Sequence, residues 1–211
     1  MPSAADEISA AIAAAGGAIP FSEYMQLALY GQGGFYTTGG RAGRRGGDFI
    51  TSPEVGPLFG SVIARALDAW WKEIGSPSRF DVVECGAGPG TLARSILAAQ
   101  PECADAMHYV AVEISVSQRA LHPQGVESRE TVPDGPITGV IVANELLDNL
   151  PFRLFVFDGS WMEAFVSQAS GGQFVEVLRA PDVVPSCLPQ IAPHGSRAPV
   201  QDAATSWVRD C

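Results

Sequence analysis

The sequence has little charge, and most of what it has is negative. Of its 211 residues, 17% are charged and 46% are hydrophobic, whereas an average globular chain is roughly 25% charged. This balance excludes an intrinsically disordered chain, which would show the opposite composition. The formal net charge of −10 repels a phosphate backbone, so we expect no nucleic-acid partner.

Metal-ligand patterns and long apolar runs are also lacking. The four cysteines form no CxxC pair, and no histidine completes a zinc-ligand pattern, so we expect no metal site and a reduced protein. No segment approaches the roughly 18 uninterrupted apolar residues of a membrane span. Asp6 and Glu7 stand where a signal or transit peptide would need basic residues. These absences predict a soluble, cytoplasmic protein with no membrane partner.

Residues 1–78 are predicted to form an N-terminal helical cap. Ser3 and Asp6 have the spacing of a capping box before a first helix, and residues 21–30 follow a helical period. A glycine-rich loop over 31–52 precedes a third helix, which Pro57 begins and Gly75 ends. An apolar stripe runs along this third helix.

The pattern changes to alternating strands and helices over residues 79–180. Strands are expected at 80–85, 109–113, 126–132 and 137–143, with a helix at 91–99. The strand at 137–143 is apolar at nearly every position, which is typical of a parallel sheet buried on both faces. This region is therefore predicted as a Rossmann-like α/β core with a β-hairpin insertion near residue 159. Residues 181–211 are predicted as a proline-rich segment and a terminal helix.

A glycine-rich motif follows the strand at 80–85. It reads Glu84-x-Gly86-x-Gly88-x-Gly90 and stands directly before the predicted helix. Glycines let the backbone turn sharply and approach a ligand, and a helix N-terminus offers free N–H groups. A dinucleotide fingerprint would place its third glycine at position 91, which is Thr91. The GxGxG spacing is instead that of class I methyltransferases, which bind S-adenosyl-L-methionine.

An acidic residue ends the next strand. A carboxylate at Glu113 can accept hydrogen bonds from both hydroxyls of an adenosine ribose. The simpler alternative is a solvated acid at a strand end, but the pairing with the glycine loop favours a ribose ligand. This pair alone fits NAD as well as S-adenosyl-L-methionine, so the glycine spacing must separate them.

Asn144, Glu145 and Asp148 follow the strand at 137–143, at the edge where open parallel sheets bind ligands. Asn and Asp also favour ordinary surface turns. Two acids within so short a segment favour a catalytic role, because carboxylates can hold a cationic nucleophile in line with a methyl sulfonium. These three residues are the predicted catalytic group.

Three segments together resemble the MidA-type methyltransferases, a family that includes a mitochondrial complex I assembly factor that methylates a protein arginine. The segments are residues 46–54 (GGDFITSPE), the glycine loop and residues 143–151 (ANELLDNLP). The resemblance, over about residues 17–178, implies S-adenosyl-L-methionine as cofactor and a protein arginine as acceptor. It implies that Glu84 and the glycine loop hold the methionine part and Glu113 the ribose. It also implies that residues 46–54 fold over the cofactor, with Asp48, Thr51 and Glu54 near the site.

One departure keeps two alternatives open. Family members are longer, and their later strands follow the point where this sequence stops, so we expect a C-terminally truncated relative with an incomplete sheet. A catalytically silent module that keeps the cofactor fold and assists assembly of a partner complex is one alternative. An NAD-type oxidoreductase is the other, disfavoured by the GxGxG spacing and by the lack of a His or Lys partner for hydride transfer. The three histidines (His108, His122 and His194) are scattered and predicted at the surface or at strand edges. The sequence leaves the methyl acceptor's identity and the oligomeric state open.

Overall fold

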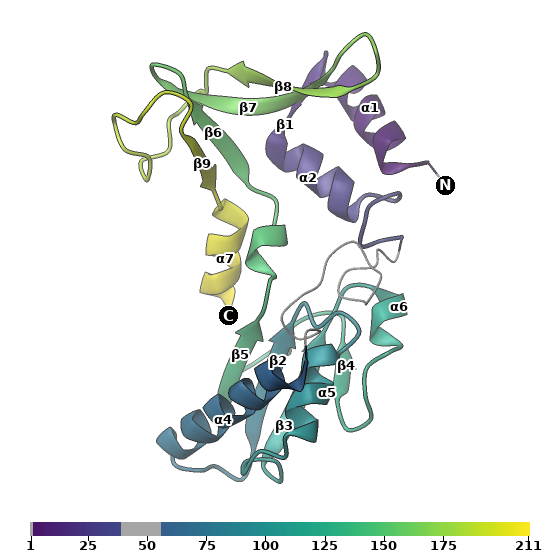
Figure 1. The fold of residues 1–211 in the computed structure, drawn as a ribbon, viewed down its shortest axis with the longest axis vertical. Coiled ribbons are helices and arrows are strands. Elements are labelled where there is room, and N and C mark those ends of the chain that lie inside the picture. Colours follow the sequence, from purple (N-terminus) through teal and green to yellow (C-terminus); the bar gives the residue numbers. More distant parts are fainter. Residues whose placement is uncertain (1, 39–55) are drawn as a thin grey trace. The chain divides into compact units, whose positions relative to one another are not determined.

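The computed structural model describes residues 2–38 and 56–211 and divides the chain into two compact units (Figure 1). One unit is Gly39–Leu146, and the other combines Met1–Thr38 with Leu147–Cys211. The predicted boundaries after residues 78 and 180 differ from this division. The reason is that the chain builds two separate sheets, and one of them combines a strand near the N-terminus with strands after residue 150.

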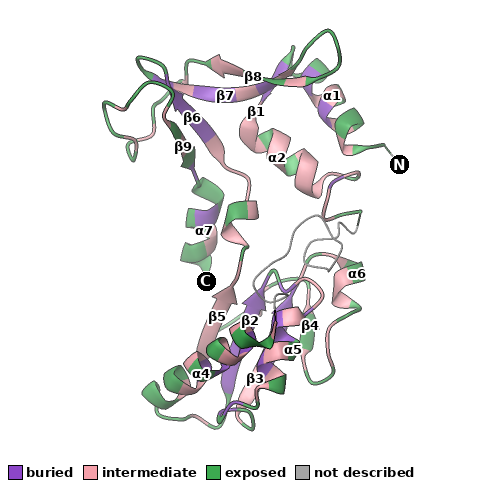
Figure 2. Cartoon of the chain, in the orientation of Figure 1, coloured by how far each residue is buried: buried purple, intermediate pink, exposed green. Residues whose placement is uncertain are grey.

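The unit Gly39–Leu146 contains a parallel sheet with the strand order β4-β3-β2-β5. Its strands are β2 (Phe80–Cys85), β3 (Met107–Val112), β4 (Glu127–Arg129) and β5 (Gly139–Ala143). The predicted α/β fold class with a parallel sheet is confirmed. Every residue of the central strand β2 is buried (Figure 2), as expected for a strand that has neighbours on both sides and helices over it.

Two helices pack on this sheet and form its core. They are α4 (Pro57–Glu73) and α5 (Thr91–Ala98), and a short helix α6 (Val116–Arg119) follows β3. Leu67 of α4 and Leu92 and Ile96 of α5 share one hydrophobic cluster with Phe80 and Tyr109 of the sheet. Because α5 begins directly after the glycine loop and packs on the sheet, it fixes the loop to the sheet.

The second unit is built around an antiparallel sheet with the order β1-β7-β6-β9, in which β8 also pairs with β7. The strands are β1 (Ala18–Pro20), β6 (Arg153–Phe157), β7 (Trp161–Gln168), β8 (Phe174–Arg179) and β9 (Arg197–Val200). The predicted hairpin forms, as β6 and β7. It belongs to this sheet and not to the parallel core, because β7 also pairs with β1 near the N-terminus.

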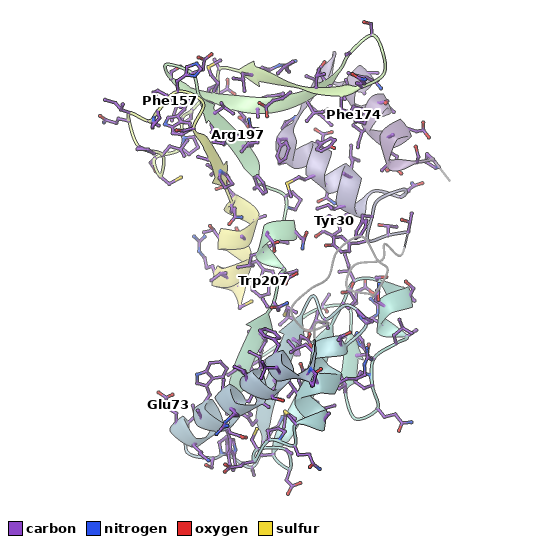
Figure 3. The ribbon with its side chains drawn as sticks, in the orientation of Figure 1. Tyr30, Glu73, Phe157, Phe174, Arg197 and Trp207 are labelled. Carbon is purple, nitrogen blue, oxygen red and sulfur yellow. The ribbon has the colours of Figure 1, made fainter. Side chains whose placement is uncertain are left out.

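Helices complete this unit. They are α1 (Ala4–Ala14), α2 (Phe21–Tyr30), η1 (Leu147–Asn149) and α7 (Asp202–Asp210). The predicted capping box at Ser3 and Asp6 is present at the start of α1. Aromatic contacts join the elements of this unit: Phe174 of β8 meets Tyr24 of α2 edge-on, and Phe157 meets Trp161 across the hairpin. Figure 3 labels Phe174 and Phe157. Over the two described ranges, no helix combines the length and apolarity that crossing a membrane requires.

Candidate cofactor-binding site

Three parallel strands end level with one another at the carboxyl edge of the sheet. Cys85, the last residue of β2, pairs with Val112 of β3 on one side and with Ala143 of β5 on the other. The next residues along the chain are Gly86, Glu113 and Asn144. The register therefore brings the glycine loop, the predicted ribose ligand and the start of the predicted catalytic segment to one edge, where open α/β sheets bind ligands.

Each glycine of the loop has a left-handed backbone, with φ values of +71° at Gly86, +53° at Gly88 and +77° at Gly90. A Cβ at Gly86 would lie 3.2 Å from Leu146 Cδ1, and one at Gly90 would lie 2.9 Å from Pro123 Cδ. Among the residues that the structure describes, none has an atom within 4 Å of a Cβ built at Gly88. Two glycines are thus required by the protein's own packing, whereas the third borders open space that a ligand can use.

Four N–H groups of the glycine loop, those of Gly86, Ala87, Gly88 and Gly90, are paired within the chain. The Gly86 and Ala87 amides donate to the Val112 carbonyl at 2.9 and 3.1 Å, and the Gly90 amide donates to Ala87 at 2.9 Å. The Gly88 amide donates to Glu113 Oε2 at 3.0 Å. The loop is therefore pre-formed, and it contributes shape and close approach more than unpaired donors.

Glu113 is fixed beside the loop by two backbone amides. Its Oε2 accepts from Gly88, and its Oε1 accepts from the Ser115 amide at 2.8 Å. An ionised carboxylate has about four acceptor positions, so two bonds leave capacity for a pair of hydroxyls. The half-buried carboxylate is oriented before any ligand arrives.

The predicted catalytic residues follow β5 directly. Asn144 is half-buried and Glu145 is exposed, and Glu145 has a left-handed φ of +54°. Such a backbone is uncommon for glutamate, and strained residues of this kind concentrate at functional sites. Asp148 is exposed within η1 and belongs to the second unit. Asp48, Thr51 and Glu54 lie outside the described residues.

Comparison with known proteins assigns the family. Residues 62–211 match a family model described as "Putative S-adenosyl-L-methionine-dependent methyltransferase". This chain belongs to that methyltransferase family. The resemblance to MidA-type enzymes is thereby confirmed, and the family's cofactor is S-adenosyl-L-methionine.

One crystal structure and two named arginine methyltransferases are similar to this chain. A COG1565 superfamily member from Burkholderia thailandensis, crystallised with S-adenosyl-homocysteine, superposes with a TM-score of 0.82 at 33% identity over 98% of this chain. The protein arginine methyltransferase NDUFAF7 homolog of Drosophila melanogaster is 33% identical over 73% of the chain, and the Rattus norvegicus NDUFAF7 is 29% identical over 86%. The chain spans 42% and 41% of the length of these two relatives and 58% of the crystallised protein.

The residues at the carboxyl edge fit the methyltransferase cofactor. The open space beside Gly88 admits a ligand where any side chain would intrude. The Glu113 carboxylate accepts a hydrogen bond from the amide of the same glycine, so a ligand bound beside Gly88 would meet an acidic acceptor.

Glu84 lies beneath the methyltransferase glycine loop rather than at its surface. The side chain is 4% exposed, and its Oε2 accepts a hydrogen bond of 2.7 Å from the hydroxyl of the buried Tyr109. Burial raises the pKa of Glu84 to about 7, although the Tyr109 hydroxyl and the charge of Arg94 act to lower it. From this buried position Glu84 can support the conformation of the glycine loop. Its role as a direct cofactor contact stays a prediction.

Sequence reasoning missed His122, which contacts the loop from the segment between α6 and β4. Its Nε2 lies 2.9 Å from the Gly88 carbonyl oxygen, and its Nδ1 lies 2.8 Å from Ser128 Oγ. The contact joins residues 34 positions apart, and no local motif surrounds the histidine. No sequence pattern therefore indicated it.

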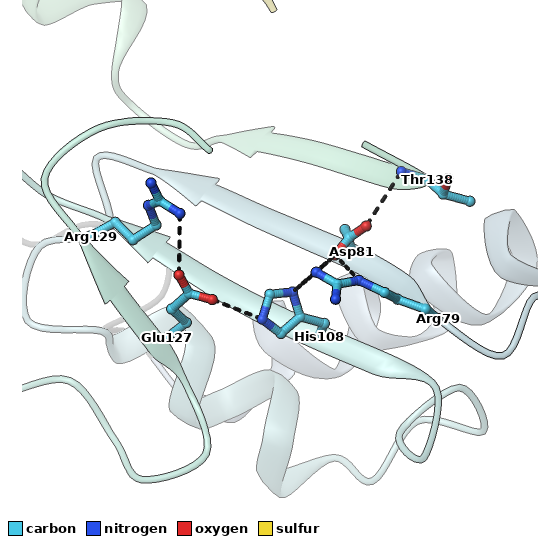
Figure 4. Close-up of polar contacts among 6 residues, drawn as sticks. All are labelled: Arg79, Asp81, His108, Glu127, Arg129 and Thr138. Atoms are coloured by element: carbon cyan, nitrogen blue, oxygen red, sulfur yellow. Dashed lines mark hydrogen bonds and ion pairs between the residues drawn. The ribbon is translucent and has the colours of Figure 1, made fainter. Parts of the chain in front are cut away.

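A second polar cluster occupies the opposite, amino end of the sheet (Figure 4). His108 of β3 lies 2.9 Å from both Asp81 of β2 and Glu127 of β4, and Arg79 also binds Asp81. Burial acts to raise the pKa of Asp81, but the hydrogen bonds from His108 and Arg79 outweigh it, so the net pKa is lowered. Within the residues that can be described, no group of three or more His, Cys, Asp or Glu side chains is arranged to hold a metal ion. The cluster joins three neighbouring strands away from the loop.

Proposed function

We propose that this chain binds S-adenosyl-L-methionine at the carboxyl edge of its parallel sheet, and that the protein methylates an arginine of a protein substrate in the cytoplasm. The observation that carries the proposal is the open space at Gly88 beside the Glu113 carboxylate, which Gly88 and Ser115 hold in place. The names of the fly and rat relatives support arginine as the acceptor.

On the cofactor side, the glycine loop and Glu113 would bind and orient S-adenosyl-L-methionine. Glu113 accepts hydrogen bonds from the ribose hydroxyls, while the left-handed backbone of the loop glycines lets the chain pass close to the methionine part. When bound, S-adenosyl-L-methionine supplies an electrophilic methyl group on a sulfonium. By the resemblance, Asp48, Thr51 and Glu54 complete this side of the site.

On the acceptor side, carboxylates hold a cation. A guanidinium has an unperturbed pKa of about 12.5 or higher, so it arrives protonated at neutral pH. Glu145 and Asp148 can fix its planar, forked donors and draw positive charge away from the attacking nitrogen. Asn144 offers an amide at the end of β5 that can add a further hydrogen bond. Most of the rate gain then comes from alignment of the nitrogen with the methyl group.

The test begins with calorimetric titration of the chain with S-adenosyl-homocysteine. In Glu113→Gln, an amide NH2 group replaces one carboxylate oxygen and faces a donor from which that oxygen accepts a hydrogen bond. We therefore expect the affinity for S-adenosyl-homocysteine to fall about ten- to a hundredfold, as for loss of a charge-assisted hydrogen bond. Glu73→Gln is the matched control, because Glu73 is an exposed residue at the end of α4. A chain that does not bind the ligand would refute the cofactor assignment.

Methyl transfer to arginine-containing proteins, followed with labelled cofactor, tests the acceptor side. Glu145→Gln and Asp148→Asn should lower transfer strongly while affinity for S-adenosyl-homocysteine stays within about twofold. Equal loss of cofactor affinity would move these acids to the cofactor side. Tight cofactor binding without transfer to any arginine protein would favour the catalytically silent module.

A further inference from the structure

Side chains hold both polar groups of the Gly88 backbone. The N–H donates to Glu113 Oε2 at 3.0 Å, and the carbonyl oxygen lies 2.9 Å from His122 Nε2. Because a carbonyl only accepts, the histidine must carry its proton on Nε2 and donate it. In the neutral ring Nδ1 is then the acceptor for the Ser128 hydroxyl.

The segment that carries His122 is itself anchored to the loop. Arg94 of α5 donates to the Leu121 carbonyl at 3.0 Å. A Cβ at Gly90, the N-cap of α5, would lie 2.9 Å from Pro123 Cδ and 3.2 Å from His122 Cδ2. Residues 121–123 therefore pack against the glycine loop, with van der Waals contact at Gly90 and a hydrogen bond at Gly88.

The two bonds at Gly88 control different peptide units. Glu113 fixes the peptide between Ala87 and Gly88, and His122 fixes the peptide between Gly88 and Pro89. The second peptide has no N–H because its nitrogen belongs to proline, so its carbonyl is the only group by which a hydrogen bond can orient it. Without His122, nothing that the structure describes for this peptide would hold that carbonyl away from the open space beside Gly88.

We propose that His122 is a positioning residue of the cofactor site, which holds the Gly88–Pro89 peptide in the orientation that receives the methionine part of S-adenosyl-L-methionine. This inference rests on the proposed function. A pre-formed loop binds more tightly than one that must be ordered by the ligand, since ordering opposes association. His122 thus contributes to affinity without touching the cofactor.

The experiment compares two amides that differ in reach. In His122→Gln the amide nitrogen extends about as far as Nε2 and can still donate to Gly88. In His122→Asn it extends only about as far as Nδ1, so the bond to Gly88 is lost. His122→Ala removes both bonds, and His194→Ala is the control because His194 is an exposed histidine of the second unit.

By calorimetry with S-adenosyl-homocysteine, we expect His122→Asn and His122→Ala to bind about three- to tenfold more weakly, the loss typical of one neutral hydrogen bond. His122→Gln and His194→Ala should stay within about twofold of the unmodified chain. In the ligand-free chain, amide exchange of Ala87, Gly88 and Gly90 should accelerate in the Asn and Ala variants and not in the Gln variant. Should the Ala variant fail to fold, the contrast between Gln and Asn decides.

The outcomes separate this inference from the function on which it rests. Equal affinity and equal loop exchange in the Gln and Asn variants would overturn the role of His122 and leave the cofactor assignment intact. Absence of ligand binding by the unmodified chain would overturn both. Weaker binding with recovery by glutamine alone supports the inference.

Discussion

Replacing Glu84 with glutamine tests how the buried carboxyl beneath the glycine loop affects stability. Glu84 of β2 is 4% exposed, and Tyr109, whose hydroxyl donates to it, is 1% exposed. Burial disfavours the charged form, which raises the pKa of Glu84 from 4.5 to about 7. Glutamine keeps the size of the side chain and an acceptor for Tyr109, but it does not titrate.

The sign follows from proton binding. Between pH 4.5 and 7 the folded chain holds a proton on Glu84 that the unfolded chain has released, so the unfolded state binds fewer protons. The free energy of unfolding therefore falls as pH rises through this window. The contribution is fully present below pH 4.5 and lost above about 7. A difference of about 2.5 pH units, at roughly 1.4 kcal/mol each, gives a loss on the order of 3 kcal/mol.

Urea unfolding of both proteins at intervals from pH 4 to pH 8 measures the effect. Groups that titrate alike in both proteins cancel in the difference. We therefore expect Glu84→Gln to gain stability relative to the unmodified chain as pH rises, by up to about 3 kcal/mol. Glu73→Gln, at an exposed position of α4, should run parallel to the unmodified chain. A difference between Glu84→Gln and the unmodified chain that stays flat over this range would refute the raised pKa.

Two further predictions concern packing and acid stability. Gly60→Ala should lower the free energy of unfolding by about 1–3 kcal/mol in urea, because its Cβ would lie 2.3 Å from Ser95 Cβ where α4 crosses α5; Gly171→Ala, with open space around its Cβ, should change stability little. For Asp81, burial acts to raise the pKa, but the hydrogen bonds to His108 and Arg79 outweigh it and the net pKa is lowered. The ionised Asp81 therefore stabilises the fold above the ordinary pKa of aspartate, and this stabilisation is lost as the pH falls through the lowered pKa. Asp81→Asn should therefore flatten the decline in stability below about pH 4, measured by urea unfolding, and an unchanged acid decline would contradict this.

The strands of the parallel sheet could be predicted because their signals are local. The expected strand at 80–85 matches β2, and the expected strand at 137–143 contains β5. The segment 137–143 is a nearly continuous apolar run, as buried parallel strands are, whereas 80–85 combines four apolar residues with Asp81 and Glu84; both segments end in turn residues. The same locality made the glycine loop visible, since its three glycines follow one strand and precede one helix.

Two strands of the antiparallel sheet, β1 and β9, could not be predicted, because they depend on distant pairing. Strand β1 has three residues, and its Ile19 pairs with Val166 of β7. Strand β9 contains Pro199, which pairs with Leu154 of β6 within a segment that was predicted only as proline-rich. Proline is tolerated in β9 because that strand lies at the edge of the sheet. Neither strand has enough residues to show a period of two.

Helix α4 was predicted, but its apolar stripe indicated only part of its buried face. Leu67 of the stripe is buried, yet Leu58 and Val62 are exposed. The small residues Gly60 and Ala64 are buried as well. The close approach of α4 and α5 at Gly60 selects small residues for the contact. A pattern of hydrophobicity along one helix cannot report how near its neighbour lies.

Three carboxyl groups lie at or beneath the carboxyl edge of the sheet. Glu113 is held beside the loop by the Gly88 amide, Glu145 follows the end of β5, and Glu84 lies buried on β2 with a pKa of about 7. The chain as a whole carries a formal charge of −10. A methyl donor with a sulfonium and an acceptor with a guanidinium are both cations, so the same field attracts both partners of the proposed reaction. The field speeds encounter and excludes anionic competitors, while the fixed peptides at Gly88 determine where the donor rests.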